Sequence, residues 1–337
     1  MDLVFFGTLR SGSGMNVKWV AKRMMMGISV LFIISFLSFF IMQLAPGDPA
    51  TAFYGGNAQT LNAAEKERIS RAFSLDRPVI EQYGAWLKET MQGNLGYSSK
   101  EGRPVTTILL ERLPNTLLLS SVTLLFIIIG SQWIGTVAGM KAGSLWDKGL
   151  STMSIATSSI PSFWLGILFI SFFSVKLGIL PSSGTGDIGG DGGFLDKLRH
   201  LIMPAAVIIL THIGIYARFL QESIKAESSK YYVMVARANG VVESEIRKGI
   251  LRNASIPYLN YIGMTIPSFF GGSIIVESLF SWAGLGQLMV KAVMMKDFPL
   301  IMGGILLIGL LVVLSLFVID LIMYAVDPKL RKGAYSR

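Results

Sequence analysis

The chain has 337 residues; 52% of them are apolar, 15% are charged and none is cysteine. Soluble domains carry about 25% charged residues, so this composition excludes an ordinary soluble fold and indicates an integral membrane protein. Without cysteine there are no disulfides, cysteine nucleophiles or thiolate metal sites. The net charge of +9 is expected in loops at a membrane surface rather than on a nucleic-acid-binding face.

Six charge-poor runs are long enough to cross a bilayer, which takes roughly 17–25 helical residues. None of them alternates with a period of two, so we predict an all-α membrane protein with six transmembrane helices. The first span is 24–45, and a core over 113–326 holds the others at about 113–140, 149–175, 201–221, 256–280 and 300–325.

Lysine and arginine are concentrated on one side of these spans. The segment 1–23, the connection 141–148, the loop 222–257 and the tail 327–337 carry sixteen of them, whereas the short loops on the other side carry five. Because positively charged loops stay in the cytoplasm, both termini are predicted to be cytoplasmic. Span 24–45 is longer than a signal-peptide core and lacks an A-x-A site, so it is expected to be an uncleaved anchor.

The long loop 46–112 is predicted to be extracytoplasmic and helical. The run 46–49 (Pro-Gly-Asp-Pro) ends the first span, 62–73 is predicted to be a short helix, and Pro78 begins another. The apolar residues of that second helix share one face at helical spacing: Val79, Tyr83, Trp86 and Leu87. A helical cap that packs on the membrane domain is the simpler interpretation, and a ligand site is the alternative.

The loop 181–193 is rich in glycine, serine and aspartate. Asp187, Asp191 and Asp196 lack the D-x-D-x-D-G spacing of a calcium loop, so a solvated loop is expected. The chain also contains no G-x-x-x-x-G-K-[ST] loop for ATP and no H-E-x-x-H motif. With only two histidines in addition, we expect no enzyme activity, no metal and no cofactor bound by this chain.

The segment 222–257 is about 36 residues long and too polar to enter the membrane. Tyr232–Ala238 is predicted to be a short helix that Asn239 and Gly240 end, and Glu243 to open a second helix that ends toward Pro257. Loops of this length without a function are uncommon, so a docking surface is favoured over a plain connection.

Three ionisable residues of the predicted spans are candidates for a translocation path, namely His212, Glu277 and Asp320, whereas Arg218 lies at the cytoplasmic end of its span, where its side chain can reach the membrane surface. Charges in the membrane are costly, so each either faces a translocation path or is a packing partner, and both alternatives stay open. Pro161 and Pro267 predict kinks whose freed backbone groups line a cavity. Gly135-x-x-x-Gly139 predicts a close helix contact.

Ordered motifs run through nearly the whole chain. They are Leu44–Pro49, Gly93–Tyr97, Arg112–Thr116, Ile160–Gly166, Tyr232–Gly240, Leu251–Ala254 with Pro257, and Asp327–Pro328. In these motifs the chain resembles the permease subunits of bacterial ABC importers of the dipeptide, oligopeptide and nickel class, specifically the first or B-type permease.

The resemblance implies a type I ABC importer permease fold in the bacterial inner membrane, in contact with lipid. It implies a second permease subunit, two ATP-binding subunits that use ATP and Mg²⁺, and an extracytoplasmic binding protein that delivers a small peptide or a nickel or metal chelate. A coupling loop that docks on the ATPase would include Tyr232, Val233, Ala236, Arg237, Ala238 and Gly240. The family's Glu-Ala-Ala opening is not intact in this loop, and Ala283 stands where the family usually has proline.

The alternative from another class is a proton-coupled secondary transporter that uses Asp320, Glu277 or His212 as a relay. Such a protein predicts an inverted repeat with broken helices near mid-membrane, and no inverted repeat is found in the sequence. Dependence of uptake on ATP would separate the two.

Overall fold

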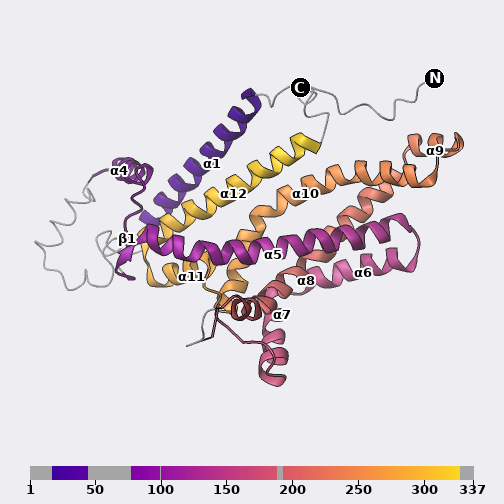
Figure 1. Ribbon diagram of the computed structural model, residues 1–337. Coiled ribbons are helices and arrows are strands. Elements are labelled where there is room, and N and C mark those ends of the chain that lie inside the picture. The colour runs from indigo at the N-terminus through magenta and orange to yellow at the C-terminus, as the bar shows by residue number, and fades with distance from the viewer. Residues whose placement is uncertain (1–16, 45–76, 99, 188–192, 327–337) are drawn as a thin grey trace, which may run out of the picture.

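The computed structural model describes residues 17–44, 77–98, 100–187 and 193–326, and these are mostly helical (Figure 1). In chain order the elements are α1 (Val17–Gln43), α4 (Val79–Met91), β1 (Tyr97–Ser98), β2 (Arg103–Pro104), α5 (Val105–Met140), α6 (Leu145–Ser159), α7 (Ser162–Phe169), a π-helical segment (Ile170–Lys176), α8 (Phe194–Ser228), α9 (Tyr231–Ala238), α10 (Glu243–Leu279), α11 (Leu285–Met295) and α12 (Phe298–Val326). The run 46–49, the predicted helix 62–73, Asp191 and the tail 327–337 lie outside the described residues.

Among the described residues, four helices are long and apolar enough to cross a membrane individually, namely α1, α5, α8 and α12. The bent pair of α6 with α7 and its π-helical continuation makes a fifth span if it is counted as one. The span predicted at 256–280 corresponds to the second part of α10, which ends at Leu279. α10 has 37 residues but is not among the helices that are apolar enough to cross a membrane by this measure. A multi-pass helical membrane protein is therefore confirmed at the level of four to five spans.

Pro161 breaks the span predicted at 149–175. Ile160 is extended, Pro161 precedes the first residue of α7, and α6 and α7 meet at an angle of 89°. The residue before a proline avoids the helical region, so α6 ends there and a new helix begins. The kink predicted at Pro161 is thus present as a complete break.

Pro257 and Pro267 do not end a helix, because both lie inside α10. The kink predicted at Pro267 stays a prediction. The expectation that a helix beginning at Glu243 ends toward Pro257 was wrong. A proline removes one helical hydrogen bond, and helices packed in a membrane bundle tolerate that loss. The predicted loop 222–257 is correspondingly short in the structure, since α8 extends to Ser228 and α10 starts at Glu243.

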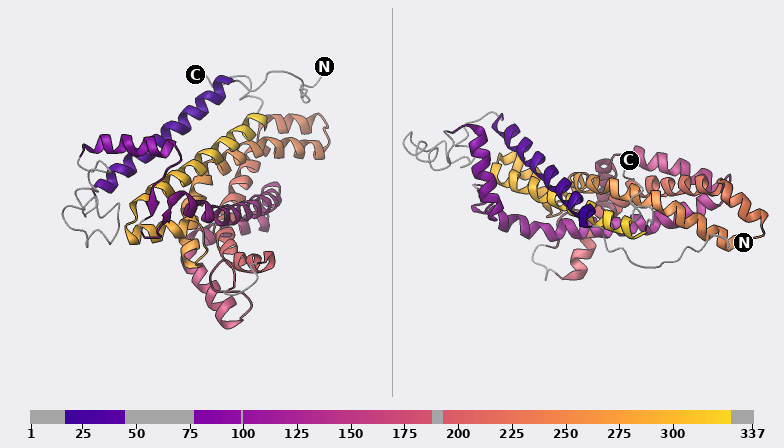
Figure 2. Two further views of the ribbon diagram at one scale, coloured as in Figure 1. Left: turned by 60° about the vertical axis from the view of Figure 1, so that its left-hand side comes forward. Right: turned by 90° about the horizontal axis from the view of Figure 1, so that it is seen from above.

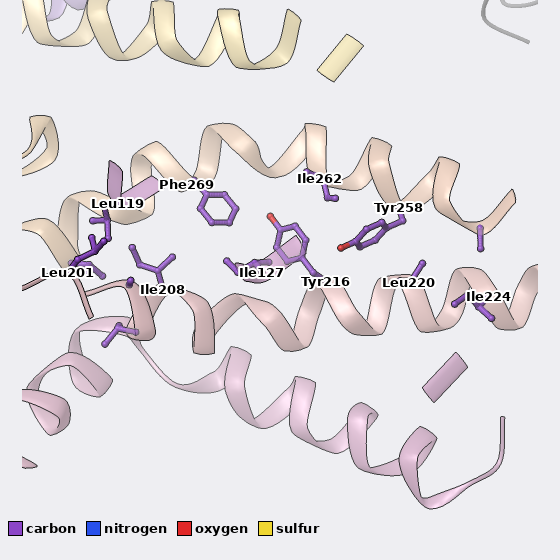
Figure 3. Close-up of a cluster of buried hydrophobic side chains, with 14 of the residues drawn as sticks. Leu119, Ile127, Leu201, Ile208, Tyr216, Leu220, Ile224, Tyr258, Ile262 and Phe269 are labelled. Carbon is purple, nitrogen blue, oxygen red and sulfur yellow. The ribbon is translucent and has the colours of Figure 1, made fainter. Parts of the chain in front are cut away.

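The core forms where α8 packs between α5 and α10. Gly135 and Gly139 of α5 face α8 so closely that a Cβ atom on Gly135 would lie 2.6 Å from the carbonyl oxygen of Ala217. The close contact predicted from their spacing is confirmed. On the other side of α8, buried side chains of α8 and α10 point toward one another along the pair (Figure 3).

The helix α4 packs on α1. Tyr83 is buried against Phe39 and Met302, with Trp86 beside them, and the hydroxyl groups of Tyr83 and Ser35 lie 2.9 Å apart. The predicted apolar face of this helix and its packing on the membrane domain are confirmed. The outward side of α1 exposes large apolar side chains, as contact with lipid requires.

Candidate functional site

The helix α9 lies at one end of the bundle, and α4 lies at the other (Figure 1). The helix α9 has eight residues and follows α8 after a two-residue connection. Gly240 has φ +70°, its N–H donates to the carbonyl of Arg237, and the N–H of Val241 donates to the carbonyl of Ala236. These two bonds around a left-handed glycine form a Schellman motif, so the stop predicted at Asn239 and Gly240 is confirmed.

The two faces of α9 have different surroundings. Val233 is fully buried and Ala236 nearly so, and both pack in the main cluster with Ile246 and Ile250 of α10. The opposite face consists of exposed residues spaced i, i+3, i+4 and i+7, which we call the α9 stripe: Tyr231, Met234, Val235 and Ala238. Residues at this spacing lie on one side of a helix.

The residues predicted for docking therefore divide between the two faces. Ala238 belongs to the stripe, and Arg237 is exposed and pairs with Glu243 across the turn at 3.2 Å. Val233 and Ala236 face inward, so their size is set by the chain's own core. The sequence-based interpretation missed Tyr231, Met234 and Val235, although their helical spacing with Ala238 was readable.

Glu277 is fully buried at the end of α10. Its carboxylate accepts hydrogen bonds from the hydroxyl of Thr116 at 3.0 Å and from the N–H groups of Gly286 and Gln287 at 2.7 and 3.2 Å. These N–H groups belong to the first turn of α11 and have no partner within their own helix. Of the two alternatives for Glu277, the geometry supports the packing partner.

Asp320 and His212 also have neighbours within the bundle. Asp320 of α12 pairs with Arg23 of α1 at 3.1 Å, and these helices lie side by side (Figures 1 and 2). The Nδ1 atom of His212 lies 2.9 Å from the carbonyl oxygen of Ile208, and its ring packs on Phe269 with 5.1 Å between centroids. The structure does not bring His212, Glu277 and Asp320 together as a relay would require.

Within the described residues, one group of side chains has the composition of a metal site: Asp187, Asp196 and His200. The Nδ1 atom of His200 lies 3.0 Å from the carbonyl oxygen of Asp196 and 3.2 Å from its Oδ1 atom. The other carboxylate oxygen of Asp196 accepts the N–H of Asp187 at 2.9 Å. In this geometry Asp196 and Nδ1 of His200 contact each other, so the three residues form a hydrogen-bonded cluster.

The outer side of α5 carries a groove that is open along the helix. It is lined by Ile128, Ile129, Gln132, Trp133, Thr136 and Val137. Trp133 is 67% exposed there. An amide and an indole on a membrane-spanning surface favour contact with another protein over contact with lipid tails.

Comparison with known families adds to this geometry. Residues 131–332 match the model of the binding-protein-dependent transport system inner membrane component, and residues 16–120 match the N-terminal model of the same membrane components. The chain belongs to this family. It is therefore a multi-pass protein of the bacterial inner membrane and a permease component of a binding-protein-dependent transport system.

Relatives in this family match over almost their whole length. The oligopeptide transport system permease protein AppB of Bacillus subtilis (strain 168) is 34% identical over 93% of this chain and 98% of its own. The di/tripeptide transport system permease protein DppB of Pseudomonas aeruginosa (strain UCBPP-PA14) is 32% identical over 94% and 99%. A chain of the inward-facing MetNI methionine ABC transporter is 20% identical, with a TM-score of 0.49 over 65% of this chain and 96% of that one.

Proposed function

We propose that the chain is the B-type permease of an ATP-driven importer and forms half of its translocation path. The two relatives named above carry oligopeptide and di/tripeptide in their names, which supports a small peptide as the substrate. Nickel or a metal chelate is the second substrate class to test. ATP and Mg²⁺ are used by two partner ATPase subunits, and an extracytoplasmic binding protein delivers the substrate.

The observation that carries the proposal is the α9 stripe. Four exposed, mostly apolar residues on one side of a short helix, at a polar end of the bundle, are expected to be covered by a partner. An apolar helix face binds in a groove of its partner, so the ATPase is expected to seat α9 in such a groove. The buried Val233 and Ala236 hold the helix to the permease from the opposite side.

Co-purification tests this docking. Met234→Glu places a charge in the stripe and is expected to remove the ATPases from the purified complex. Lys248→Glu changes the charge of a side chain that is 74% exposed on α10 and is the matched control. Normal ATPase association of Met234→Glu would exclude the stripe as the docking surface.

Uptake by proteoliposomes tests the transport class. The assembled transporter, supplied with labelled peptide on its binding protein, is expected to accumulate peptide only with internal ATP and to be unaffected by a proton ionophore. Competition by unlabelled peptides but not by nickel complexes is expected. Uptake without ATP that the ionophore abolishes would favour the proton-coupled alternative.

A second permease subunit is proposed to cover the groove on α5. Its helices would shield Gln132 and Trp133 from lipid, which is favourable because polar groups are costly in hydrocarbon. A cysteine at Thr136, which lines the groove, is expected to cross-link to the second permease and not to the ATPases. Cross-linking to neither would place that subunit on another face.

Six spans with both termini in the cytoplasm complete the proposal, with α6 and α7 together as one span and α10 as another. The chain has no cysteine of its own, so single cysteines report topology cleanly. Cysteines at the exposed Glu101 and Ser183 are expected to react with an impermeant reagent added outside, and one at the exposed Ser229 is not. Reaction of the cysteine placed at Ser229 in sealed cells would show that the topology is the opposite of the one proposed.

A further inference from the structure

Glu227 joins three elements where the bundle meets α9. Glu227 lies one residue before the end of α8 and is 6% exposed. Its Oε1 atom accepts hydrogen bonds from the hydroxyl of Tyr232 in α9 at 2.9 Å and from the side-chain amide of Asn253 in α10 at 3.0 Å. Its Oε2 atom pairs with Lys230, in the connection, at 2.5 Å. We call these four residues the Glu227 clamp.

From this geometry we propose that Glu227 is a positioning residue that fastens α9 to the ends of α8 and α10, so that movement of a docked ATPase reaches the membrane-spanning helices. The proposal rests on the proposed docking of α9. It assigns to Glu227, Tyr232 and Asn253 the transmission of movement, separate from the binding of the ATPase by the α9 stripe.

A helix of eight residues needs such a fastening. Isolated helices of this length are marginal in water, so the orientation of α9 depends on what holds it. Val233 and Ala236 supply apolar contact, which is not directional. The clamp supplies hydrogen bonds to a charged acceptor, which are short and directional.

The chemistry of the clamp suits a permanent connection. Burial raises the pKa of the Tyr232 phenol, the hydrogen bond from Asn253 lowers it, and the carboxylate of Glu227 raises it, with a net rise. The phenol therefore stays protonated and remains a donor to Glu227 at physiological pH. Glu227 itself is buried and Tyr232 is half-buried, so removal of the carboxylate would take away the acceptor of a partly shielded hydroxyl, which costs more than the loss of an exposed ion pair.

The clamp and the stripe lie on different sides of α9. The hydroxyl of Tyr232 contacts Glu227 and Asn253 of this chain, whereas Tyr231, Met234, Val235 and Ala238 are exposed. A variant of the clamp therefore keeps the docking surface but lets α9 shift against the bundle. Such a variant is expected to bind ATPases normally and to hydrolyse ATP with less transport.

The test uses the complete transporter with Tyr232→Phe, which removes one oxygen and keeps the ring, and with Glu227→Gln, which keeps the size of the side chain. Three quantities are measured: co-purification of the ATPases, ATP hydrolysis stimulated by the loaded binding protein, and substrate uptake per ATP hydrolysed. We expect normal co-purification and uptake per ATP reduced about fivefold or more, the factor that corresponds to one lost hydrogen bond.

A matched control and a double variant sharpen the result. Glu245→Gln breaks an exposed pair with Lys248 that has the same three-residue spacing as Glu227 and Lys230, and it should leave all three quantities unchanged. Glutamine keeps one oxygen that can accept from Tyr232, so the double variant uses alanine. Glu227→Ala combined with Tyr232→Phe should lose no more coupling than Glu227→Ala alone, because the alanine variant already lacks the acceptor of the Tyr232 hydroxyl.

Unchanged uptake per ATP in both single variants would overturn the proposal. Loss of ATPase co-purification in Tyr232→Phe would also overturn it, because the hydroxyl would then belong to the docking surface. Failure of the proposed docking would be seen in a different measurement, because the ATPases would then still co-purify with the stripe variant Met234→Glu.

Discussion

The carboxylate of Glu277 accepts the backbone N–H of Gly286 at 2.7 Å, and this contact joins the end of α10 to the beginning of α11. The N–H of Leu285 is held nearby by the hydroxyl of Thr116, which itself donates to Glu277. One acidic residue thus caps the first turn of α11 from another helix, where a negative charge is favourable. Asn115 extends the connection, since its side chain donates to the carbonyl of Ala283 at 2.8 Å.

The stability of the purified transporter should fall when Glu277 is replaced. Glu277→Ala leaves buried donors without an acceptor, at a cost of about 1–3 kcal/mol for each donor. Glu277→Gln keeps one acceptor oxygen and should cost less than Glu277→Ala. Thermal unfolding in detergent measures both, with the exposed Glu245→Gln as the control. Equal melting temperatures for Glu277→Ala and the wild type would show that these hydrogen bonds do not stabilise α11.

The sequence could not decide between the two alternatives for Glu277. Its partners are backbone groups and Thr116, which is 161 positions away. A sequence does not indicate which side chain will accept a hydrogen bond from a distant backbone N–H. The helix α9 was predictable because a short amphipathic run and an Asn-Gly stop are local signals. Which side of α9 faces inward was not predictable, because Ile246 and Ile250 of α10 determine it.

Of the glycines of α5 that face α8, Gly130 and Gly135 should respond differently to a methyl group. At Gly135 a Cβ atom would lie 2.6 Å from the backbone oxygen of Ala217, whereas at Gly130 it would meet the end of the Ile213 side chain at 2.5 Å. Backbone cannot move without displacing α8, so Gly135→Ala should destabilise by about 1–3 kcal/mol.

Gly130→Ala is the comparison. The Ile213 side chain can rotate away, and alanine favours the helix by up to about 1 kcal/mol over glycine, so its melting temperature should stay near that of the wild type. A larger drop in melting temperature for Gly130→Ala than for Gly135→Ala, measured by thermal unfolding in the same detergent, would contradict the packing described for α5 and α8.

The Arg23–Asp320 pair offers a test of the proton relay. Its side chains are 44% and 24% exposed, so the pair is only partly shielded and should contribute little to stability, about 0–1 kcal/mol. Asp320→Asn should therefore keep ATP-driven uptake near the wild-type rate. An aspartate that carries protons in each transport cycle would lose uptake altogether on this change. Uptake by proteoliposomes distinguishes the two outcomes, and Arg23→Gln should behave like Asp320→Asn.

Substitution of Gly240 should act through the backbone alone. Its φ is +70°, and no atom lies within 4 Å of where a Cβ would be. Any residue with a Cβ pays for the left-handed conformation, about 1–2 kcal/mol, so Gly240→Ala and Gly240→Leu should weaken ATPase association equally, by about 5–30-fold. Gly240→Asn should be milder, since asparagine adopts this conformation more readily. Association is measured by titration of ATPase onto the reconstituted permease pair. If leucine abolished association and alanine did not, a wall of the ATPase would lie against this turn, and the docking surface would extend past the α9 stripe to Gly240.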